Sequence, residues 1–328
     1  MSSLPALGRA VEALAGASDV ALACHVNPDA DAIGSMLGLS NHLRGLGTRT
    51  VCSFPNEPFD APRWASLLPG NEALVPPAGF PQAPEVMVTC DTASMDRLGV
   101  LAPVAERART LIWIDHHVSN DGLGTIPLID ARASSTAEIV WRLVRELGGE
   151  VSAATASCLY AGLVTDTGRF QYQAVGPDTL RLAAELRELP FEHTRLVQAL
   201  YEDNSAAYLR VLGVALERIV LEPHADLVWS YLTRADLVEA GVAPSETDDL
   251  IDVVRTAREA DVAAVIKQQR DGRFKVSLRS RGGHDVAAVA AVFGGGGHRL
   301  AAGYTSGHGL AETVERLKAA LRGEPVEP

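Results

Sequence analysis

The first half of the chain alternates short apolar runs with amphipathic stretches, which is the pattern of βαβ units on a parallel sheet. The apolar runs predict four strands, at residues 19–26, 48–54, 85–90 and 110–114. Periodicity near 3.6 residues predicts four helices, at residues 32–46, 136–147, 153–164 and 179–189. The proline-rich segment 54–84 predicts a long irregular connection. These elements together predict an α/β domain in which helices flank a parallel sheet.

The second half begins with a charged, helical segment, residues 191–218, that lacks any strand signal and is typical of a helical connector. A smaller α/β domain follows. Its predicted strands are residues 227–232, 262–269 and 273–280, and its predicted helices are residues 248–257, 286–293 and 310–321. We therefore expect a first domain at 1–190, a connector at 191–218, a second domain at 219–323 and a disordered tail at 324–328.

Acidic and histidine residues follow the predicted strands. The first strand is followed by His25, Asp29 and Asp31; the third by Asp91; the fourth by Asp115, His116 and His117. Ligands of open α/β sheets collect at the carboxyl ends of the strands, so these side chains are expected to meet. Asp166, which follows the helix at 153–164, would add a carboxylate. Oxygen ligands mixed with imidazole favour manganese or another divalent transition ion, and several carboxylates favour two ions over one.

Each of these motifs has a structural explanation when it is taken alone. A single DxD is often a helix cap or a turn, and a histidine at a strand end is often a packed residue. Asp166 at the end of a helix opposes the helix dipole, which indicates another partner. Their joint occurrence at the ends of neighbouring strands is what favours a metal site.

A second group of polar residues lies in the C-terminal half. Four glycines, Gly294–Gly297, precede His298 between two predicted helices, so backbone N–H groups and a helix start could face an anion. Arg279 and Arg281 flank Ser280 at a strand end and would share one face. A flexible connection and a solvated strand edge are the alternatives. Two further arginines in the expected first domain, Arg97 after Asp91 and Arg169 after Asp166, could also contact a phosphate.

Composition limits the partners. The chain has 328 residues, with 29 Lys and Arg against 41 Asp and Glu, a net charge of −12. This balance excludes a long basic track for duplex DNA or RNA but leaves short phosphorylated ligands open. No apolar run approaches the ~20 residues of a membrane span, and the N-terminus lacks the features of a secretory leader. Four cysteines without a CxxC pair favour a reduced, cytoplasmic protein.

The ordered motifs resemble those of a known family. HVNPDADAIGS, VTCDTASMDRLG, WIDHHVSN and YAGLVTDTGRF resemble the four motifs of the DHH phosphoesterase superfamily, and GGGGHRLAAG resembles the DHH-associated domain. The resemblance spans about Val20 to Gly303. In size and domain pairing the chain is most similar to the nanoRNase/pAp phosphatase branch, the bifunctional oligoribonucleases.

The resemblance implies roles for individual residues. One metal would be held by His25, Asp29 and Asp91, and a second by Asp31, Asp91, His116 and Asp166. The ions would most often be Mn²⁺, with Mg²⁺ or Co²⁺ as alternatives. His117 would face the substrate as a catalytic residue with Asp91, and Asp115 would orient the histidines. Substrate contacts would come from Arg97, Arg169, Arg279, Ser280, Arg281, Gly295, Gly296, Gly297 and His298.

The implied activity is hydrolysis of RNA or DNA fragments of two to five nucleotides to 5′-mononucleotides, and of pAp to AMP, by hydroxide held between two metals. A phosphodiesterase acting on cyclic di-AMP or pApA could use the same residues. A catalytically silent nucleotide-binding sensor is the alternative from a different class. A pyrophosphatase is disfavoured because GGGGH stands in place of a lysine-rich motif. The connector could also supply the face of a homodimer.

Overall fold

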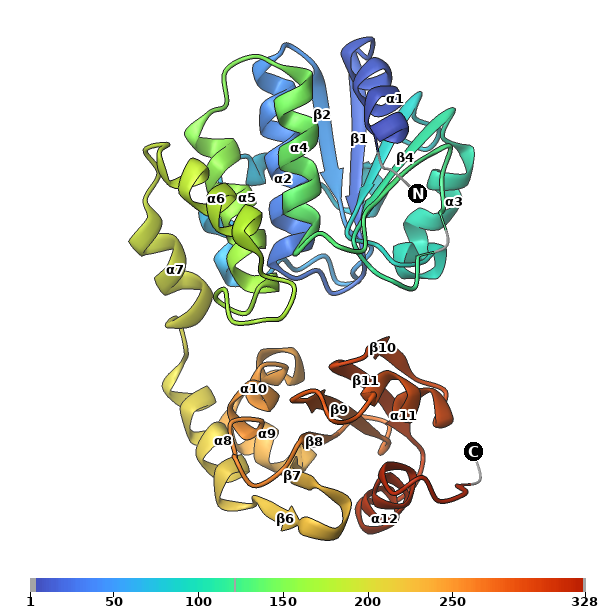
Figure 1. The fold of residues 1–328 in the computed structure, drawn as a ribbon, viewed down its shortest axis with the longest axis vertical. Helices are drawn as coiled ribbons and strands as arrows, with labels where there is room; N and C mark the ends of the chain where they lie inside the picture. The colour runs from blue at the N-terminus through green and yellow to red at the C-terminus, as the bar shows by residue number, and fades with distance from the viewer. Residues whose placement is uncertain (1–3, 121, 327–328) are drawn as a thin grey trace. The chain divides into compact units, whose positions relative to one another are not determined.

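The computed structural model describes residues 4–120 and 122–326, which form two compact units. The first unit ends at Asp203 and the second begins at Asn204, so the boundary falls within the segment 191–218. Each unit contains one sheet covered by helices (Figure 1). The predicted α/β class is therefore confirmed, with a parallel sheet in the first unit and a mixed sheet in the second.

The first sheet is five-stranded and fully parallel, in the order β2-β1-β3-β4-β5. Its strands are β1 (Asp19–Cys24), β2 (Arg49–Ser53), β3 (Val86–Cys90), β4 (Thr110–Asp115) and β5 (Ile126–Ile129). The pattern of apolar residues predicts the first four but misses β5, which is four residues long and contains Pro127. Proline lacks an N–H donor and is tolerated on an edge strand, which is where β5 lies.

Alternate residues of the strands face two different cores. Val20, Leu22 and Cys24 of β1 pack against a layer of helices, whereas Ala21 and Ala23 face the opposite side. The helical layer comprises α1 (Leu4–Ala15), α2 (Ala30–Gly45), α4 (Thr136–Leu147) and α5 (Ala153–Asp166). The opposite face is covered by α3 (Ala102–Arg107) and the 3₁₀ turn before it. Because both faces are buried, the strands are continuous apolar runs.

Two more helices extend the helical layer. They are α6 (Pro177–Arg187) and α7 (His193–Tyr201), and both pack against α5. The segment 54–84 is irregular apart from three short 3₁₀ turns, as its prolines predict. The pattern of hydrophobic and polar residues does not predict helix α1.

Helices α2 and α5 approach each other very closely through glycines. A Cβ atom on Gly34 of α2 would lie 2.4 Å from the carbonyl oxygen of Cys158, and one on Gly162 of α5 would lie 2.6 Å from Oδ1 of Asp31. Only residues without a side chain allow this approach. It brings the beginning of α2 to the end of α5, where Asp166 lies.

The second unit contains a six-stranded sheet in the order β10-β11-β9-β8-β7-β6, in which only β7 and β8 are parallel. Its strands are β6 (Val220–Glu222), β7 (Leu227–Leu232), β8 (Val262–Gln268), β9 (Phe274–Ser280), β10 (Gly296–His298) and β11 (Ala301–Ser306). Its helices are α8 (Ala206–Glu217), α9 (Arg234–Ala240), α10 (Leu250–Val254), α11 (Val286–Val292) and α12 (Leu310–Leu321).

The sequence predicts β7, β8, β9, α11 and α12 within one residue at each end, and it misses α9 and the short strands β6, β10 and β11. The helix predicted at 248–257 is confined to α10, with turns on either side.

The expectation of a helix after the glycine run is wrong. Gly296–His298 forms β10, which pairs antiparallel with β11, so strand pairing follows the glycines instead of a helix start. A Cβ atom on Gly297 would lie 2.5 Å from the carbonyl oxygen of Ala301, and its φ is +140°. The glycines therefore allow two backbones to approach closely within a hairpin.

Of the predicted tail at 324–328, residues 327 and 328 lie outside the described part of the chain, and residues 324–326 form no helix or strand. Within the described residues, no helix is both long enough and apolar enough to span a bilayer.

Candidate metal centre

Three neighbouring strands end side by side at one edge of the first sheet. Cys24 of β1 is in register with Cys90 of β3, and Cys90 is in register with Ile114 of β4. The residues that follow are His25, Asp91 and the pair His116 and His117. The strand order also reverses here, since β2 lies on one side of β1 and β3 on the other. Such a reversal leaves a crevice at the carboxyl ends of the strands.

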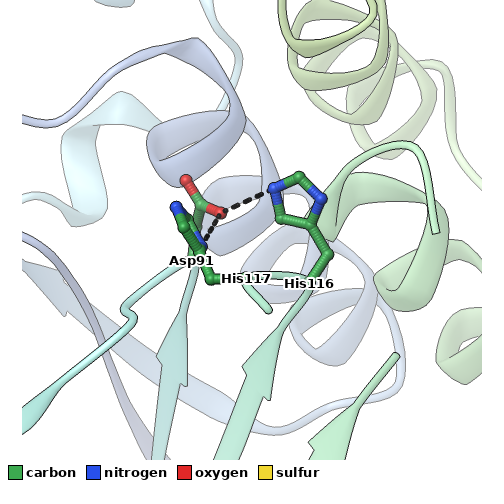
Figure 2. A group of neighbouring side chains, drawn as sticks. All are labelled: Asp91, His116 and His117. Atoms are coloured by element: carbon green, nitrogen blue, oxygen red, sulfur yellow. Dashed lines mark ion pairs between the residues drawn. The ribbon is translucent and has the colours of Figure 1, made fainter. Parts of the chain in front are cut away.

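Asp91 lies at the centre of this cluster. Its side chain is 3% exposed, and it has a left-handed φ of +55°. Its Oδ1 is 3.7 Å from Nε2 of His116 and 3.7 Å from Nδ1 of His117 (Figure 2). Its Oδ2 is 3.6 Å from Nε2 of His25. The two oxygens of one carboxylate thus face different histidines.

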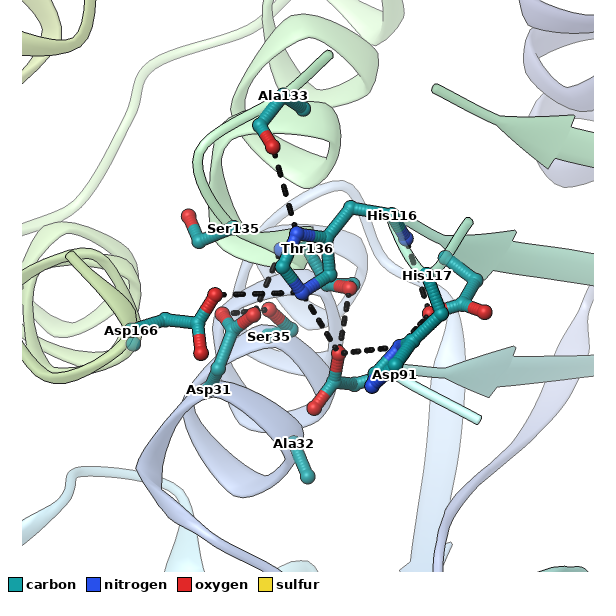
Figure 3. Close-up of polar contacts among 12 residues, drawn as sticks. Asp31, Ala32, Ser35, Asp91, His116, His117, Ala133, Ser135, Thr136 and Asp166 are labelled. Atoms are coloured by element: carbon teal, nitrogen blue, oxygen red, sulfur yellow. Dashed lines mark hydrogen bonds and ion pairs between the residues drawn. The ribbon is translucent and has the colours of Figure 1, made fainter. Parts of the chain in front are cut away.

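The orientation of the rings favours metal binding through Nε2. Nδ1 of His25 lies 2.9 Å from the carbonyl oxygen of Val26, and Nδ1 of His116 lies 3.3 Å from that of Ala133 (Figure 3). A carbonyl accepts only, so the contact with Ala133 holds the proton of His116 on Nδ1, and the contact with Val26 does so for His25 when Arg97 does not donate to that atom. The lone pair of each Nε2 then faces the carboxylates, which is the arrangement of metal-bound histidines.

The two aspartates of the DxD motif belong to the start of α2. The helix begins at Ala30, two residues before the predicted start, and Asp29 is its N-cap. Oδ2 of Asp29 lies 3.9 Å from Nε2 of His25, and the side chain of Asp29 is 61% exposed.

Asp31 is buried and accepts three hydrogen bonds from other residues. The N–H groups of Thr136 and Ala137 donate to it at 2.6 and 2.9 Å, and Oγ of Ser35 donates at 3.1 Å. The first turn of α4 is therefore aimed at the carboxylate of Asp31 (Figure 3). A helix N-terminus stabilises negative charge at this position.

Asp166 completes the cluster from the last residue of α5. Its Oδ2 is 3.2 Å from Nε2 of His116. Within this cluster, three sets of side chains have ligand atoms within 4.8 Å of one another and could hold a metal ion. The sets are His25, Asp29 and Asp91; Asp31, His116 and Asp166; and Asp91, His116 and His117. The structure thus brings together all six residues that the sequence predicts as metal ligands.

Asp115 is fully buried and contacts both histidines. Its Oδ1 is 2.7 Å from Nδ1 of His117 and accepts from the N–H of His116 at 2.9 Å. Its Oδ2 accepts from Nδ2 of Asn120 at 2.7 Å. Asp115 therefore holds His117 by Nδ1 and leaves Nε2 on the other side of the ring.

Arg97 and Arg169, the two arginines of the first unit that the sequence predicts as phosphate contacts, have different surroundings. Nη2 of Arg97 lies 3.0 Å from Nδ1 of His25, the same atom that faces the carbonyl of Val26. The two contacts exclude each other, because one needs a proton on Nδ1 and the other needs its lone pair. The guanidinium of Arg169 lies over the ring of Tyr201, 4.0 Å from the ring centroid.

The candidate phosphate-binding residues of the second unit lie around the ends of β9 and β10. Nε of Arg279 is 3.4 Å from Oδ1 of Asp252, and Arg281 is exposed just beyond β9. Oγ of Ser280 donates to Asp261 at 2.8 Å, so this hydroxyl is engaged within the unit.

In the glycine run, Gly295 donates its N–H to the carbonyl of Ala290. Gly296, Gly297 and His298 form β10, and all three are exposed.

Comparison with known proteins places the chain in a family. Residues 19–163 match the DHH family, N-terminal domain, and residues 227–324 match the DHHA1 domain. The chain is 34% identical to a protein of Thermus thermophilus named bifunctional oligoribonuclease and PAP phosphatase NrnA, over 92% of this chain and 89% of that protein. The chain belongs to the DHH phosphoesterase family.

Two further similarities were found, one in sequence and one in fold. The Bacillus subtilis protein of the same name is 29% identical to this DHH protein, over 85% of this chain and 86% of that protein. The crystal structure of an exopolyphosphatase-related protein from Bacteroides fragilis has the same fold, with a TM-score of 0.91 and 24% identity. The similarity covers 98% of this chain and 96% of the Bacteroides fragilis chain.

The DHH centre concentrates negative charge that its own residues balance only in part. Burial and the neighbouring Asp91 raise the pKa of Asp31 to about 7. Loss of solvent and the adjacent carboxylates of Asp31 and Asp91 also raise the pKa of Asp166 well above its usual range. Burial opposes ionisation of Asp91, but the surrounding imidazoles lower its pKa. A site of crowded carboxylates whose imidazole Nε2 atoms face the same space fits divalent cations.

Some supporting residues of the centre were not predicted. Besides its N–H bond to Asp31, Thr136 donates its hydroxyl to Oδ1 of Asp91 at 2.8 Å. Ser35 and Asn120 hold Asp31 and Asp115. In the sequence, residues 134–136 are recognisable only as the start of a helix. Their contact with residues about one hundred positions away depends on the packing of α4 against α2.

Proposed function

We propose that this DHH phosphoesterase hydrolyses oligonucleotides of two to five nucleotides to 5′-mononucleotides, and pAp to AMP. The proposal rests on the convergence of His25, Asp91 and His116 from three strand ends, in a chain 34% identical to a bifunctional oligoribonuclease and PAP phosphatase. The net charge of −12 supports short substrates, because a long strand needs an extended basic surface.

We propose two divalent ions in the centre, most often Mn²⁺ with Mg²⁺ or Co²⁺ as alternatives; the mixture of imidazole and carboxylate ligands favours a transition ion over Mg²⁺. One would be held by His25, Asp29 and Asp91, and the other by Asp31, Asp91, His116 and Asp166. The positions of the two Asp91 oxygens, facing His25 and His116, support a shared role for that carboxylate. When bound, such ions neutralise a phosphate and lower the pKa of an attacking water.

His117 is the proposed group that acts on the substrate. Its Nδ1 bond to Asp115 fixes the ring and stabilises its positively charged form, because a carboxylate favours an adjacent cation. Nε2 can then hold a proton for a phosphoryl oxygen or for the departing 3′-oxygen. Asp115 acts through this histidine as a positioning residue.

We propose that cationic residues hold the 5′-phosphate of the substrate. Arg279, Arg281 and His298 supply the charge, and Ser280 and the glycines Gly295–Gly297 shape the backbone beside them. Arg97 becomes available for a phosphate when Nδ1 of His25 donates to the carbonyl of Val26. Substrates would then share one plan, with the 5′-phosphate held and hydrolysis at the phosphorus on the 3′ side of that nucleotide.

The test is turnover by the manganese-loaded protein on pAp, pApA, cyclic di-AMP, RNA of two to twenty nucleotides and pyrophosphate, with products separated by anion-exchange chromatography. We expect AMP and phosphate from pAp, and 5′-mononucleotides from the shortest RNAs at the highest rates. The Asp91→Asn variant is the control and should lose turnover while keeping its far-UV circular dichroism spectrum. Absence of hydrolysis of every phosphoester would overturn the proposal.

The same panel separates the alternatives. A phosphodiesterase for cyclic di-AMP would prefer that substrate to RNA dinucleotides. A catalytically silent sensor would bind nucleotides with equal affinity before and after Asp91→Asn and would show no turnover. We also propose a cytoplasmic site of action, which the four free, buried cysteines support. A homodimer through residues 191–218 stays a prediction.

A further inference from the structure

The turn that follows Asp166 has an unusual backbone. Gly168, Arg169 and Phe170 are three consecutive residues with left-handed φ values of +55°, +60° and +64°. This conformation is unfavourable for residues with a side chain, and it persists only where the surroundings enforce it. Strained backbone of this kind is concentrated at functional sites, so the side chains that the turn presents are candidates for a functional role.

Buried groups enforce the turn. The hydroxyl of Thr167 donates to the carbonyl of Leu163 at 2.6 Å and accepts from the N–H of Phe170 at 3.1 Å. The carbonyl of Thr167 accepts from the N–H groups of Gln171 and Tyr172, at 3.0 and 3.1 Å. The side chain of Phe170 packs against the core of the first unit. The turn is therefore a rigid extension of α5.

The turn presents an arginine stacked on a tyrosine. The guanidinium of Arg169 lies 4.0 Å from the ring centroid of Tyr201 in α7. The hydroxyl of Tyr201 and the N–H of Arg169 both donate to the carbonyl of Val164, at 3.0 and 2.8 Å. Both residues are thus tied to the last turn of α5, the turn that ends in Asp166. A stacked guanidinium keeps the N–H donors at its edge available for a phosphate.

The turn also presents an aromatic ring. Tyr172 lies against Gly168, whose Cβ, if present, would be 2.3 Å from Cε1 of the tyrosine ring. Tyr172 as a whole residue is 39% exposed. An exposed aromatic ring and an arginine presented by one turn are the combination by which proteins bind single-stranded nucleotides without reading their sequence. Arg169 is three residues beyond Asp166, so their Cα atoms are within about 11 Å.

We propose that Arg169, Tyr172 and Tyr201 bind the nucleotide on the 3′ side of the scissile phosphate. Arg169 would contact its phosphate groups, Tyr172 would stack on its base, and Tyr201 would hold Arg169 in place. The inference rests on the proposed function, in which water adds its oxygen to phosphorus and the bond from phosphorus to the 3′-oxygen breaks. The 3′-oxygen leaves with a proton, and the phosphate stays on the nucleotide bound at this turn.

The proposal makes a distinction between two substrates. A dinucleotide such as pApA has a nucleotide on the 3′ side of the scissile phosphate, whereas pAp has only a terminal phosphate there. Loss of the turn's contacts should therefore reduce hydrolysis of pApA much more than hydrolysis of pAp. A purely structural role for the turn, in holding Asp166, would reduce both equally.

The experiment measures kcat/KM of the manganese-loaded full-length protein for pApA and for pAp. We expect the ratio of the two values, pApA over pAp, to fall about tenfold or more in Arg169→Gln and in Tyr172→Ala, as base stacking and phosphate contacts imply. Tyr172→Phe keeps the ring and should keep the ratio. Arg109→Gln is the matched control: its side chain is 80% exposed at the amino end of β4, the opposite edge of the sheet.

The outcomes are separable. An unchanged ratio in Tyr172→Ala, or an equal fall for both substrates in both variants, would overturn the proposal. If Arg169→Gln does not fold, Tyr172→Ala decides the question, because its side chain lies at the surface. A wild-type protein that hydrolyses neither substrate would instead refute the proposed function itself.

Discussion

The contact between Gly162 and Asp31 offers a quantitative test of how the centre is assembled. Gly162 lies in α5, where a Cβ atom would be 2.6 Å from Oδ1 of Asp31, 3.0 Å from its Cα and 3.1 Å from Cβ of Ala137. Normal contacts between carbon atoms are about 3.5–4.0 Å. Two of the three atoms belong to, or directly adjoin, the backbone of packed helices and cannot rotate away. Gly162→Ala must therefore move either α5 or Asp31.

The magnitude follows from two opposing terms. Alanine in place of glycine within a helix is favourable by about 1 kcal/mol, and overpacking a close interface costs about 1–3 kcal/mol. Gly8 in α1 provides the matched control, because a Cβ atom there would meet nothing within 4 Å. Gly8→Ala should stabilise the first unit by up to about 1 kcal/mol. The difference between the two variants therefore isolates the overpacking term, about 1–3 kcal/mol.

The assay is urea-induced unfolding followed by circular dichroism, together with turnover on a short RNA. Gly162→Ala should unfold at a lower urea concentration than Gly8→Ala. It should also lose turnover, because either Asp31 or, with α5, Asp166 is displaced from the centre. Gly8→Ala should keep the wild-type rate. Equal stability and equal turnover of the two variants would refute the close packing of α5 on Asp31.

Three further predictions concern the centre and the second unit. Asp115→Asn should reduce turnover about 10–100-fold with an unchanged far-UV spectrum. The two carboxylate oxygens accept hydrogen bonds from His117 and Asn120, and an amide has only one accepting oxygen. Full activity would contradict the role of Asp115 in holding His117. Removal of metal by a chelator should lower the urea midpoint of unfolding, and excess Mn²⁺ should restore it. The free energy of unfolding should rise by about 2.7 kcal/mol for each site at one hundred times the dissociation constant. A midpoint that does not respond to metal would contradict the metal centre. The hydrogen bond from Arg218 lowers the pKa of Asp236 from 3.8 to about 2. Because this pKa is lowered, the pair stabilises the fold above about pH 4, by about 2 kcal/mol, and the effect is lost as the pH falls to 2. The stability difference between wild type and Asp236→Asn, from urea unfolding at pH 6 and pH 2.5, should shrink accordingly; a constant difference would show that Asp236 does not titrate in this way.

Local patterns in the sequence are enough to predict most of the fold and the positions of the metal ligands. The strands β1, β3 and β4 are buried on both faces, so each is a continuous apolar run that is recognisable without any neighbour. The polar residue after each run is then placed at one edge by the parallel arrangement of the sheet. His25, Asp91 and His116 could be found in this way because their positions follow from where a strand ends.

Other features depend on contacts between distant parts of the chain. The amide of Thr136 binds Asp31 across 105 positions, and Gly162 touches the same residue through the packing of α5 on α2. The glycine run before His298 was expected to precede a helix, yet it pairs with β11. Glycines permit several backbone conformations, and the partner strand selects one of them. The amino-acid sequence by itself therefore determined which residues end each element, since that depends on neighbouring positions. Only the tertiary structure decided which of those ends meet, because long-range packing selects among local conformations of similar energy.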